Sequence, residues 1–216
     1  MKLDPREARH VLRQCDFAAL ATHSAKMPGY PFVSHAPFAL DGAGQPILLL
    51  SRLAEHTRNL AEDPRASLMV SVPGPDPQAQ PRLTLMGDLM AGPVSLALQD
   101  RYLRYHPDAA AYLGFGDFRF YRLTCKRVRL VGGFARAGWV EPAEWQARPL
   151  AEGEEAGLLG RLKRRIPTGW QILGLDWEGM DVRTADRGRL RLTWQPVPGN
   201  LDDFSDAAAG ALAQDD

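Results

Sequence analysis

Apolar and polar residues alternate in short runs, a pattern that predicts a chain built mainly from strands. We expect strands at residues 17–22, 31–40, 46–50, 66–72, 82–91 and 118–137, the last as one long strand or a hairpin. The turn residues of DGAGQ (41–45) predict that 31–50 forms a hairpin. Gly87 interrupts the run 82–91, which predicts a bulge or a close backbone contact there.

Helices are expected between only a few of these strands. Their predicted ranges are 4–14, 51–62 and 94–106, and Asp63-Pro64 and His106-Pro107 end the last two. A parallel, doubly wound sheet needs a helix between most strands, so the pattern favours a small, mostly antiparallel β-barrel with peripheral helices.

The composition changes around residues 141–153, which are rich in proline, glutamate and glycine. This change predicts a barrel domain over residues 1–148 and a small α+β domain over 149–216. In the second domain we expect a helix over 154–165, three short strands (172–176, 180–184 and 189–193) and a terminal helix from near Asn200. The fold class predicted is therefore predominantly β.

The charges of the chain balance, with 26 Lys and Arg against 26 Asp and Glu. A neutral chain gives no general reason to expect nucleic acid or a membrane surface as a partner. No apolar run approaches the roughly 18 residues of a membrane span. The two cysteines, Cys15 and Cys125, lie far apart, and the N-terminal residues are polar, so we expect a reducing, cytoplasmic location.

Hydroxyl and cationic side chains cluster just after the run 46–50, in the stretch SRLAEHTRNL. They are Ser51, Arg52, His56, Thr57 and Arg58. Arg52 and His56 are spaced i,i+4 and would share one helix face, beside the N–H groups of a helix N-terminus. This chemistry suits a phosphate monoester on a small molecule. The alternative is a solvated helix face on which Glu55 and Glu62 pair with the basic side chains.

The order of elements adds a resemblance. FVSHAPFALDGAGQPILLLSRLAEHTRNLAEDPRASLMV, RLTLMGDL and GGFARAGWV together resemble the pyridoxamine 5'-phosphate oxidase-like, FMN-binding split-barrel superfamily over roughly residues 5–145. The resemblance implies a split β-barrel that forms a homodimer, with the cofactor at the subunit interface. It implies an FMN phosphate held by Ser51, Arg52, His56, Thr57 and Arg58, a flavin ring against the strand that contains Val33, Ser34 and His35, and Arg82 near the phosphate or the ring.

The motif S-x-L-A-x-H-T-x-N-L and the GGF sequence resemble most closely the haem-utilisation branch of this superfamily, as does LDWEGMDVRTADRGRLRLTW near the C-terminus. Two features depart from the known patterns. No Arg-x-His motif occurs near the C-terminus, which argues against vitamin B6 oxidation. EEAGLLGRLKRR replaces the HMNxDH-like segment of the haem branch, and no histidine follows His106.

For the other candidate residues, the sequence allows either a role in ligand binding or an ordinary role in packing or at the surface. His35 could face a flavin or ligate haem, as could His56, or His35 could be a surface residue. Trp139 could pack beside a cofactor ring at a subunit boundary or lie in the core. His106 reads as a helix-end residue whose positive charge suits the helix dipole. Gly132-Gly133 predicts a bulge or a close approach to a ligand.

Three functions follow from the sequence. The first is an FMN-dependent oxidoreductase acting on a small molecule, with catalytic residues unknown and no protein-bound metal. The second is a haem-binding or haem-degrading protein on the same fold. The third is a ligand-binding barrel without enzyme activity.

Overall fold

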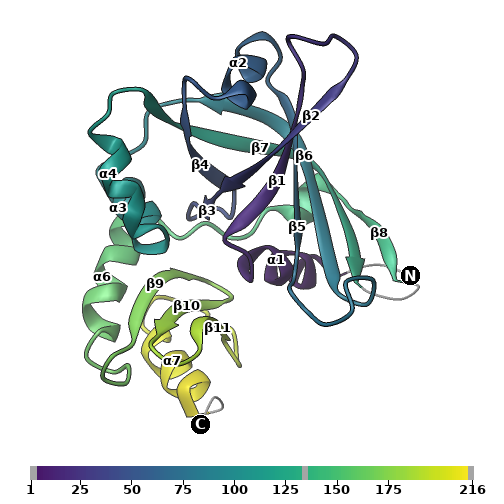
Figure 1. Ribbon diagram of the computed structural model, residues 1–216. Coiled ribbons are helices and arrows are strands. Elements are labelled where there is room, and N and C mark those ends of the chain that lie inside the picture. Colours follow the sequence, from purple (N-terminus) through teal and green to yellow (C-terminus); the bar gives the residue numbers. More distant parts are fainter. Residues whose placement is uncertain (1–3, 133–135, 214–216) are drawn as a thin grey trace.

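The computed structural model describes residues 4–132 and 136–213, and within them the chain folds around a curled antiparallel sheet (Figure 1). Its strands follow the order β2-β1-β5-β6-β7-β4-β3, with β8 paired to β7. The strands are β1 (Phe17–His23), β2 (Pro31–Pro37), β3 (Ala39–Leu40), β4 (Pro46–Ser51), β5 (Arg65–Ser71), β6 (Pro81–Ala91), β7 (Phe118–Gly132) and β8 (Ala137–Val140). This confirms the split barrel with peripheral helices that the sequence predicts.

The barrel core follows from the alternation of side chains. In β5 and β6 every second residue points inward, and Leu68, Val70, Leu83 and Leu85 are almost fully buried. The strands β2 and β4 approach each other, but no hydrogen-bonded register joins them in the described residues. The barrel is therefore open between β2 and β4.

The helices lie around the sheet. They are α1 (Pro5–Arg13), α2 (Glu55–Glu62), α3 (Leu96–Tyr105), the 3-10 turn η1 (Pro107–Ala109), α4 (Ala110–Leu113) and α5 (Pro142–Trp145). The Asp4 carboxylate accepts a hydrogen bond from the Arg6 N–H and caps α1. Asn59 in α2 donates to Thr22 Oγ1 of β1 at 2.9 Å, which fixes α2 against the barrel.

The predicted hairpin over 31–50 is largely wrong. β2 pairs with β1 along its whole length, and only Ala39–Leu40 pairs with Pro46–Ile47. The turn between β1 and β2 is closed by a bond from the Ser24 N–H to the Tyr30 carbonyl, with Gly29 at φ 90°. The turn at residues 24–30 therefore pairs β2 with β1 along its whole length. The chain reaches β4 only after the short strand β3.

The helix predicted from residue 51 begins at Glu55 instead. Ser51 ends β4, and the Arg52 N–H donates to the Asp117 carbonyl, which continues the strand pairing by one residue. Ser51 Oγ accepts from the Leu53 N–H at 3.1 Å, which closes a local turn before the helix. The predicted shared helix face of Arg52 and His56 is therefore wrong, because Arg52 precedes the helix.

Two other local predictions are confirmed. The register of β6 against β7 shifts between Met86 and Gly87, and a Cβ on Gly87 would lie 2.1 Å from the Thr124 carbonyl oxygen. The long run from residue 118 forms the strand β7, which pairs antiparallel with β8. Gly133, the second glycine of the predicted break, lies outside the described residues.

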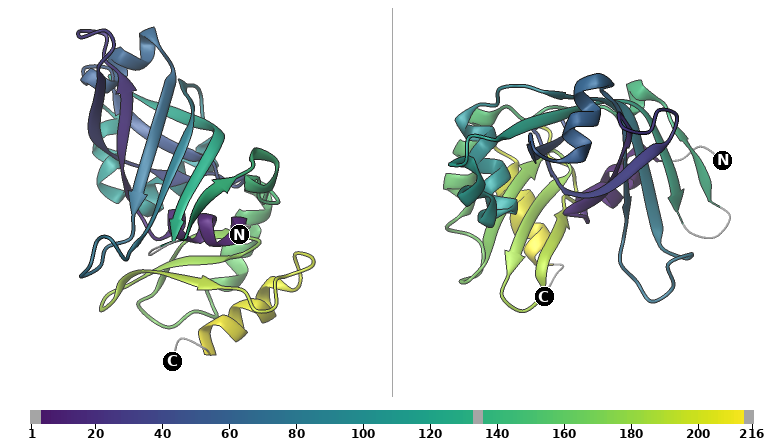
Figure 2. Two further views of the ribbon diagram at one scale, coloured as in Figure 1. Left: turned by 90° about the vertical axis from the view of Figure 1, so that its right-hand side faces the viewer. Right: turned by 45° about the horizontal axis from the view of Figure 1, so that its top comes forward.

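The C-terminal unit, defined here as Glu152–Ala213, has its own apolar core. It contains α6 (Glu152–Leu162), a sheet of β9 (Gln171–Asp176), β10 (Gly179–Thr184) and β11 (Gly188–Thr193), and α7 (Phe204–Ala213). Figure 2 shows this unit beside one end of the barrel, with α1 between them. The boundary at residues 148 and 149 stays a prediction. Among the described helices, none has the length and apolar character needed to cross a membrane.

Candidate functional site

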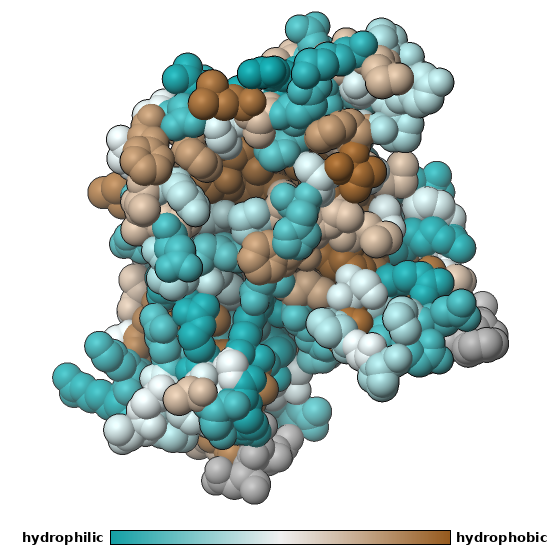
Figure 3. Space-filling view, in the orientation of Figure 1, coloured by the Kyte–Doolittle hydropathy of each residue, from teal (hydrophilic) through white to brown (hydrophobic). Residues whose placement is uncertain are grey.

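A cleft of about 790 Å³ opens where the barrel is split. One wall comes from β2 and β4, and the facing wall comes from α3, η1 and α4. Figure 3 shows a hollow in the upper half of the molecule, over these elements, in which brown residues gather. The surface of the cleft is therefore largely apolar. The main lining residues are Phe17, His35, Ser51, His56, Tyr102, Tyr105, His106, Tyr112, Phe118 and Arg183.

Aromatic rings form much of the apolar surface of the cleft. Tyr112 stacks on Phe118, with ring centroids 5.0 Å apart and an interplanar angle of 13°. Tyr102 packs edge to face with Phe120 on the inner side, and burial raises the pKa of its hydroxyl above the ordinary value. The aromatic and aliphatic walls suit a large, flat, apolar ligand.

Three histidines line the cleft, and they differ in burial and in hydrogen bonding. His35 is exposed on β2 and stacks on Phe17 at 4.8 Å. His106 Nε2 lies 2.8 Å from the Phe38 carbonyl oxygen, so this nitrogen carries the proton and donates. Burial lowers the pKa of His106, so it is not the charged helix-end residue that the sequence predicts.

His56 differs from the other two because one of its ring nitrogens is both buried and without a hydrogen-bond partner among the described residues. Its Nδ1 lies 3.0 Å from Ser34 Oγ, while Nε2 is buried and has no hydrogen-bond partner among the described residues. Burial lowers the pKa of His56 below its ordinary value of 6.5, which favours the neutral ring. The Ser34 hydroxyl can donate to Nδ1 or accept from Nδ1–H. In the tautomer with the proton on Nδ1, Nε2 keeps a free lone pair, the arrangement of a metal-ligating histidine.

The strand-to-helix junction holds the other residues predicted to bind phosphate. Ser51 Oγ donates to the Asp117 carboxylate at 2.7 Å, and Arg52 lies 3.4 Å from the Gly116 carbonyl oxygen. Thr57 Oγ1 is buried without a partner in the described part of the chain, whereas Arg58 is exposed. The Asp117 carboxylate thus occupies the Ser51 hydroxyl and places a negative charge where the phosphate was expected.

Arg82 and Trp139 lie away from the cleft. Arg82 pairs with Val131 on β7, whereas Ser51 pairs with Phe118 at the opposite end of the same strand. Trp139 is 42% exposed on β8, and the guanidinium groups of Arg127 and Arg129 lie 4.4 and 5.2 Å from its ring centroid. Within one chain neither residue joins the site. Val33 is also exposed, on β2.

Several cleft residues are not predicted from the sequence. Tyr102, Tyr112 and Arg183 line the cleft, and Asp117 bonds to Ser51 at its edge; all four come from segments with ordinary helix, loop and strand patterns. Their proximity depends on how α3 and the C-terminal unit pack against the barrel. The one local signal was His106-Pro107, which marks the helix end but not the side chain's contact with the Phe38 carbonyl.

Comparisons with known proteins agree with this fold. The chain is 39% identical over 223 residues to the chloroplastic non-canonical haem oxygenase HOZ of Arabidopsis thaliana, covering 93% of this chain and 69% of HOZ. A haem-binding protein from Mycobacterium smegmatis has a similar structure, with 27% identity, a TM-score of 0.62 and coverage of 99% of this chain and 98% of that one. A protein of unknown function from Agrobacterium tumefaciens has 27% identity and a TM-score of 0.78, covering 95% and 94%.

The superfamily resemblance seen in the sequence is confirmed as a likeness of fold, since similar solved structures include a protein of the pyridoxinephosphate oxidase family from Clostridium acetobutylicum, at 14% identity and a TM-score of 0.50, and ChuZ from Campylobacter jejuni, at 20% and 0.57. Residues 1–147 match the family described as CREG, β-barrel, a match that spans the whole curled sheet. The chain therefore belongs to the CREG β-barrel family.

Proposed function

We propose that this protein binds haem in the cleft at the split of the barrel and takes part in haem breakdown. The observation that carries the proposal is His56, a neutral imidazole that lines a large apolar cleft and has one buried nitrogen without a partner among the residues that the structure describes. The 39% identity to a non-canonical haem oxygenase supports it.

The residues present fit haem in three respects. The cleft has the volume and aromatic lining that a flat macrocycle needs. His56 Nε2 would be the iron ligand once the atoms that cover it move aside, and Ser34 would orient the ring by accepting from Nδ1–H. Tyr102, Tyr112 and Phe118 would exclude water from the faces of the macrocycle. When bound, haem supplies the iron redox chemistry that dioxygen activation requires.

FMN is the second candidate, because Thr57 Oγ1, at the junction that resembles an FMN phosphate site, is a buried hydroxyl without a partner in residues 4–132 and 136–213. Arg52 and Arg58 are exposed beside it and could pair with a phosphate. The Asp117 carboxylate bonded to Ser51 counts against this candidate, because a phosphate there would face a like charge. A flavin-dependent oxidoreductase therefore ranks below haem binding, and a non-enzymatic ligand-binding barrel ranks third.

Parallel titrations of the purified protein with haemin and with FMN test this order. We expect haemin to give a saturable Soret band with one site per chain, and FMN to leave the flavin fluorescence unchanged at micromolar concentrations. Saturable FMN binding without a haemin complex would overturn the proposal. Binding of neither ligand would favour a barrel with another ligand.

The homodimer is part of this proposal. Apolar side chains project from the outer face of the sheet, where Val33 is 60%, Met69 44%, Met86 41% and Trp139 42% exposed. A partner covering this face would bury them, and it could bring Arg82 and Trp139 to the cofactor of the other subunit. Sedimentation analysis should give twice the chain mass of 23.9 kDa, and Trp139→Glu should shift the mass towards the monomer. A monomeric wild-type protein would contradict the dimer.

A further inference from the structure

We propose that Arg183, from the C-terminal unit, is the carboxylate-binding residue of the cleft, so that the ligand has an acidic group attached to an apolar body. The inference deepens the proposed function and, for haem, assigns Arg183 to a propionate side chain. It also makes the C-terminal unit part of the binding site rather than an appendage.

Arg183 reaches the cleft from β10 and contacts the end of α3. Its two terminal nitrogens donate to the carbonyl oxygens of Arg104 and Tyr105, at 3.1 and 2.8 Å. These carbonyls belong to the last turn of α3, where helical partners are lacking. The guanidinium is therefore held against the cleft wall by backbone groups, and it lines the cleft beside His106.

In the described part of the chain, no acidic side chain forms an ion pair with Arg183. Among the described residues, no carboxylate oxygen lies within ion-pair distance of its side chain, and the two carbonyls use only two of its five N–H donors. The cleft also contains Asp16 and Asp108. Asp16 is already paired with Arg189, and Asp108 is exposed on η1. A ligand carboxylate would therefore find free donors and a free cationic charge at Arg183.

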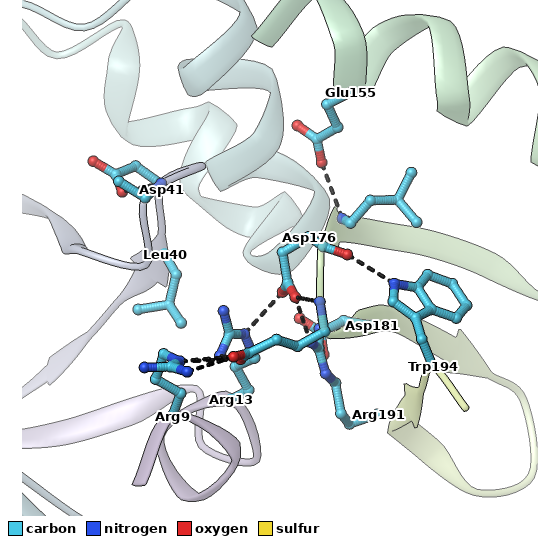
Figure 4. A network of polar contacts seen from close by, with 12 residues as sticks. Arg9, Arg13, Leu40, Asp41, Glu155, Asp176, Asp181, Arg191 and Trp194 are labelled. Carbon is cyan, nitrogen blue, oxygen red and sulfur yellow. Dashed lines mark hydrogen bonds and ion pairs between the residues drawn. The ribbon is translucent and has the colours of Figure 1, made fainter. Parts of the chain in front are cut away.

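A buried network of charges fixes the C-terminal unit, and with it Arg183, against the barrel. Figure 4 shows Arg9 and Arg13 of α1 facing Asp176 and Arg191 of the C-terminal sheet. Arg13 Nε lies 2.8 Å from Asp176, and Arg191 lies 2.7 Å from the other oxygen of the same carboxylate. These ion pairs are almost fully buried, so the unit cannot shift without separating charges in an apolar setting.

A second set of contacts joins β9 and β10 to α3. The Tyr105 hydroxyl donates to Asp181 at 2.6 Å, and both Arg101 and Arg104 pair with Glu155 of α6. Gly174 permits this close approach, because a Cβ there would lie 2.3 Å from the Tyr105 hydroxyl oxygen. The position of Arg183 relative to the aromatic walls is therefore set before any ligand binds, which favours specific recognition.

The placement of the Arg183 cation at the side of an aromatic cleft indicates the class of ligand. Aromatic residues cover the cleft, while the cation lies at one side beside His106. This pattern fits a rigid apolar compound with a peripheral carboxylate, and haem has two such groups. It does not favour FMN in the same place, because the phosphate of FMN was expected at Ser51 on the other wall.

Esterified ligands separate this role from a structural one. The full chain would be titrated with haemin and with haemin dimethyl ester, using the wild type, Arg183→Gln, Arg183→Lys and the control Arg164→Gln, which changes an exposed arginine of the same unit. We expect Arg183→Gln to weaken haemin binding about tenfold and to change ester binding less than about twofold. Arg183→Lys should retain part of the haemin affinity, and Arg164→Gln should behave as the wild type.

Equal weakening of both ligands by Arg183→Gln would show that Arg183 only caps α3, and unchanged haemin binding would also overturn the inference. If the wild type binds neither haemin nor its ester, the proposed function fails, and pyrenebutyrate with its methyl ester replaces the pair. Selective loss of pyrenebutyrate in Arg183→Gln would then support the carboxylate site alone. No such loss, or no binding of either pyrene compound, would refute it.

Discussion

Replacing His56 by alanine is expected to weaken haemin binding by about a hundredfold and to shift the Soret band of the remaining complex. The reason is the state of the imidazole, which is neutral, half-buried and held at Nδ1 by Ser34, with Nε2 lacking a partner in the described residues. Removing it leaves the cleft without the proposed iron ligand. Haemin titrations followed by absorbance measure both effects.

His35→Ala is the matched control, because His35 also lines the cleft but is exposed and stacked on Phe17. This variant should bind haemin nearly as the wild type does. Added imidazole should restore the Soret position of His56→Ala, since the cavity left by the side chain admits the free ligand. Unchanged binding in His56→Ala, or loss of the complex in His35→Ala, would contradict the assignment of the ligand.

Asp176→Asn is expected to lower the free energy of unfolding by about 3–5 kcal/mol at pH 7. The Asp176 carboxylate is buried and lies 2.8 Å from Arg13 and 2.7 Å from Arg191, so its loss leaves two buried guanidinium groups without that counter-charge. Urea unfolding measures the change. The control is Asp202→Asn, because Asp202 is almost fully exposed and should change stability by less than about 0.5 kcal/mol.

The same comparison has a defined pH dependence. Burial alone would raise the pKa of Asp176, but Arg13 and Arg191 outweigh it and hold the pKa well below the ordinary value. The ionised carboxylate therefore contributes stability that is fully present above the unfolded-state pKa of about 3.9 and is lost as the pH falls through the lower folded-state pKa. The difference between wild type and Asp176→Asn should be constant from pH 7 to 5 and should shrink below about pH 4. A constant difference at pH 3 and below would contradict this account.

Local signals in the sequence predict most of the strands and helices, because alternation, turn residues and caps act within a few residues. The bulge at Gly87 is such a case. The partner of β2 is not, because both β1 and β4 are apolar strands of similar length, and the choice between them depends on the turn at 24–30. The predicted start of α2 at residue 51 is wrong because the Arg52 N–H bonds to the Asp117 carbonyl, a contact between residues far apart in the chain.

The sequence likewise predicts only part of the candidate site. His35, Ser51 and His56 lie at the cleft, and Ser34 bonds to His56, so the motif around them predicts part of the site. Arg183 could not be predicted, because its place depends on buried ion pairs between α1 and the C-terminal sheet. The sequence also does not predict that the Asp117 carboxylate lies beside Ser51, because the two residues are far apart in the chain. This negative charge is a reason to rank haem above FMN as the candidate cofactor.

A crystal structure of the protein grown with haemin, with data collected at the iron absorption edge, tests the central claim most directly. The account predicts one anomalous iron peak per chain inside the cleft, within bonding distance of His56 Nε2. An iron peak bound elsewhere, or a flavin in the cleft in place of haem, would contradict it.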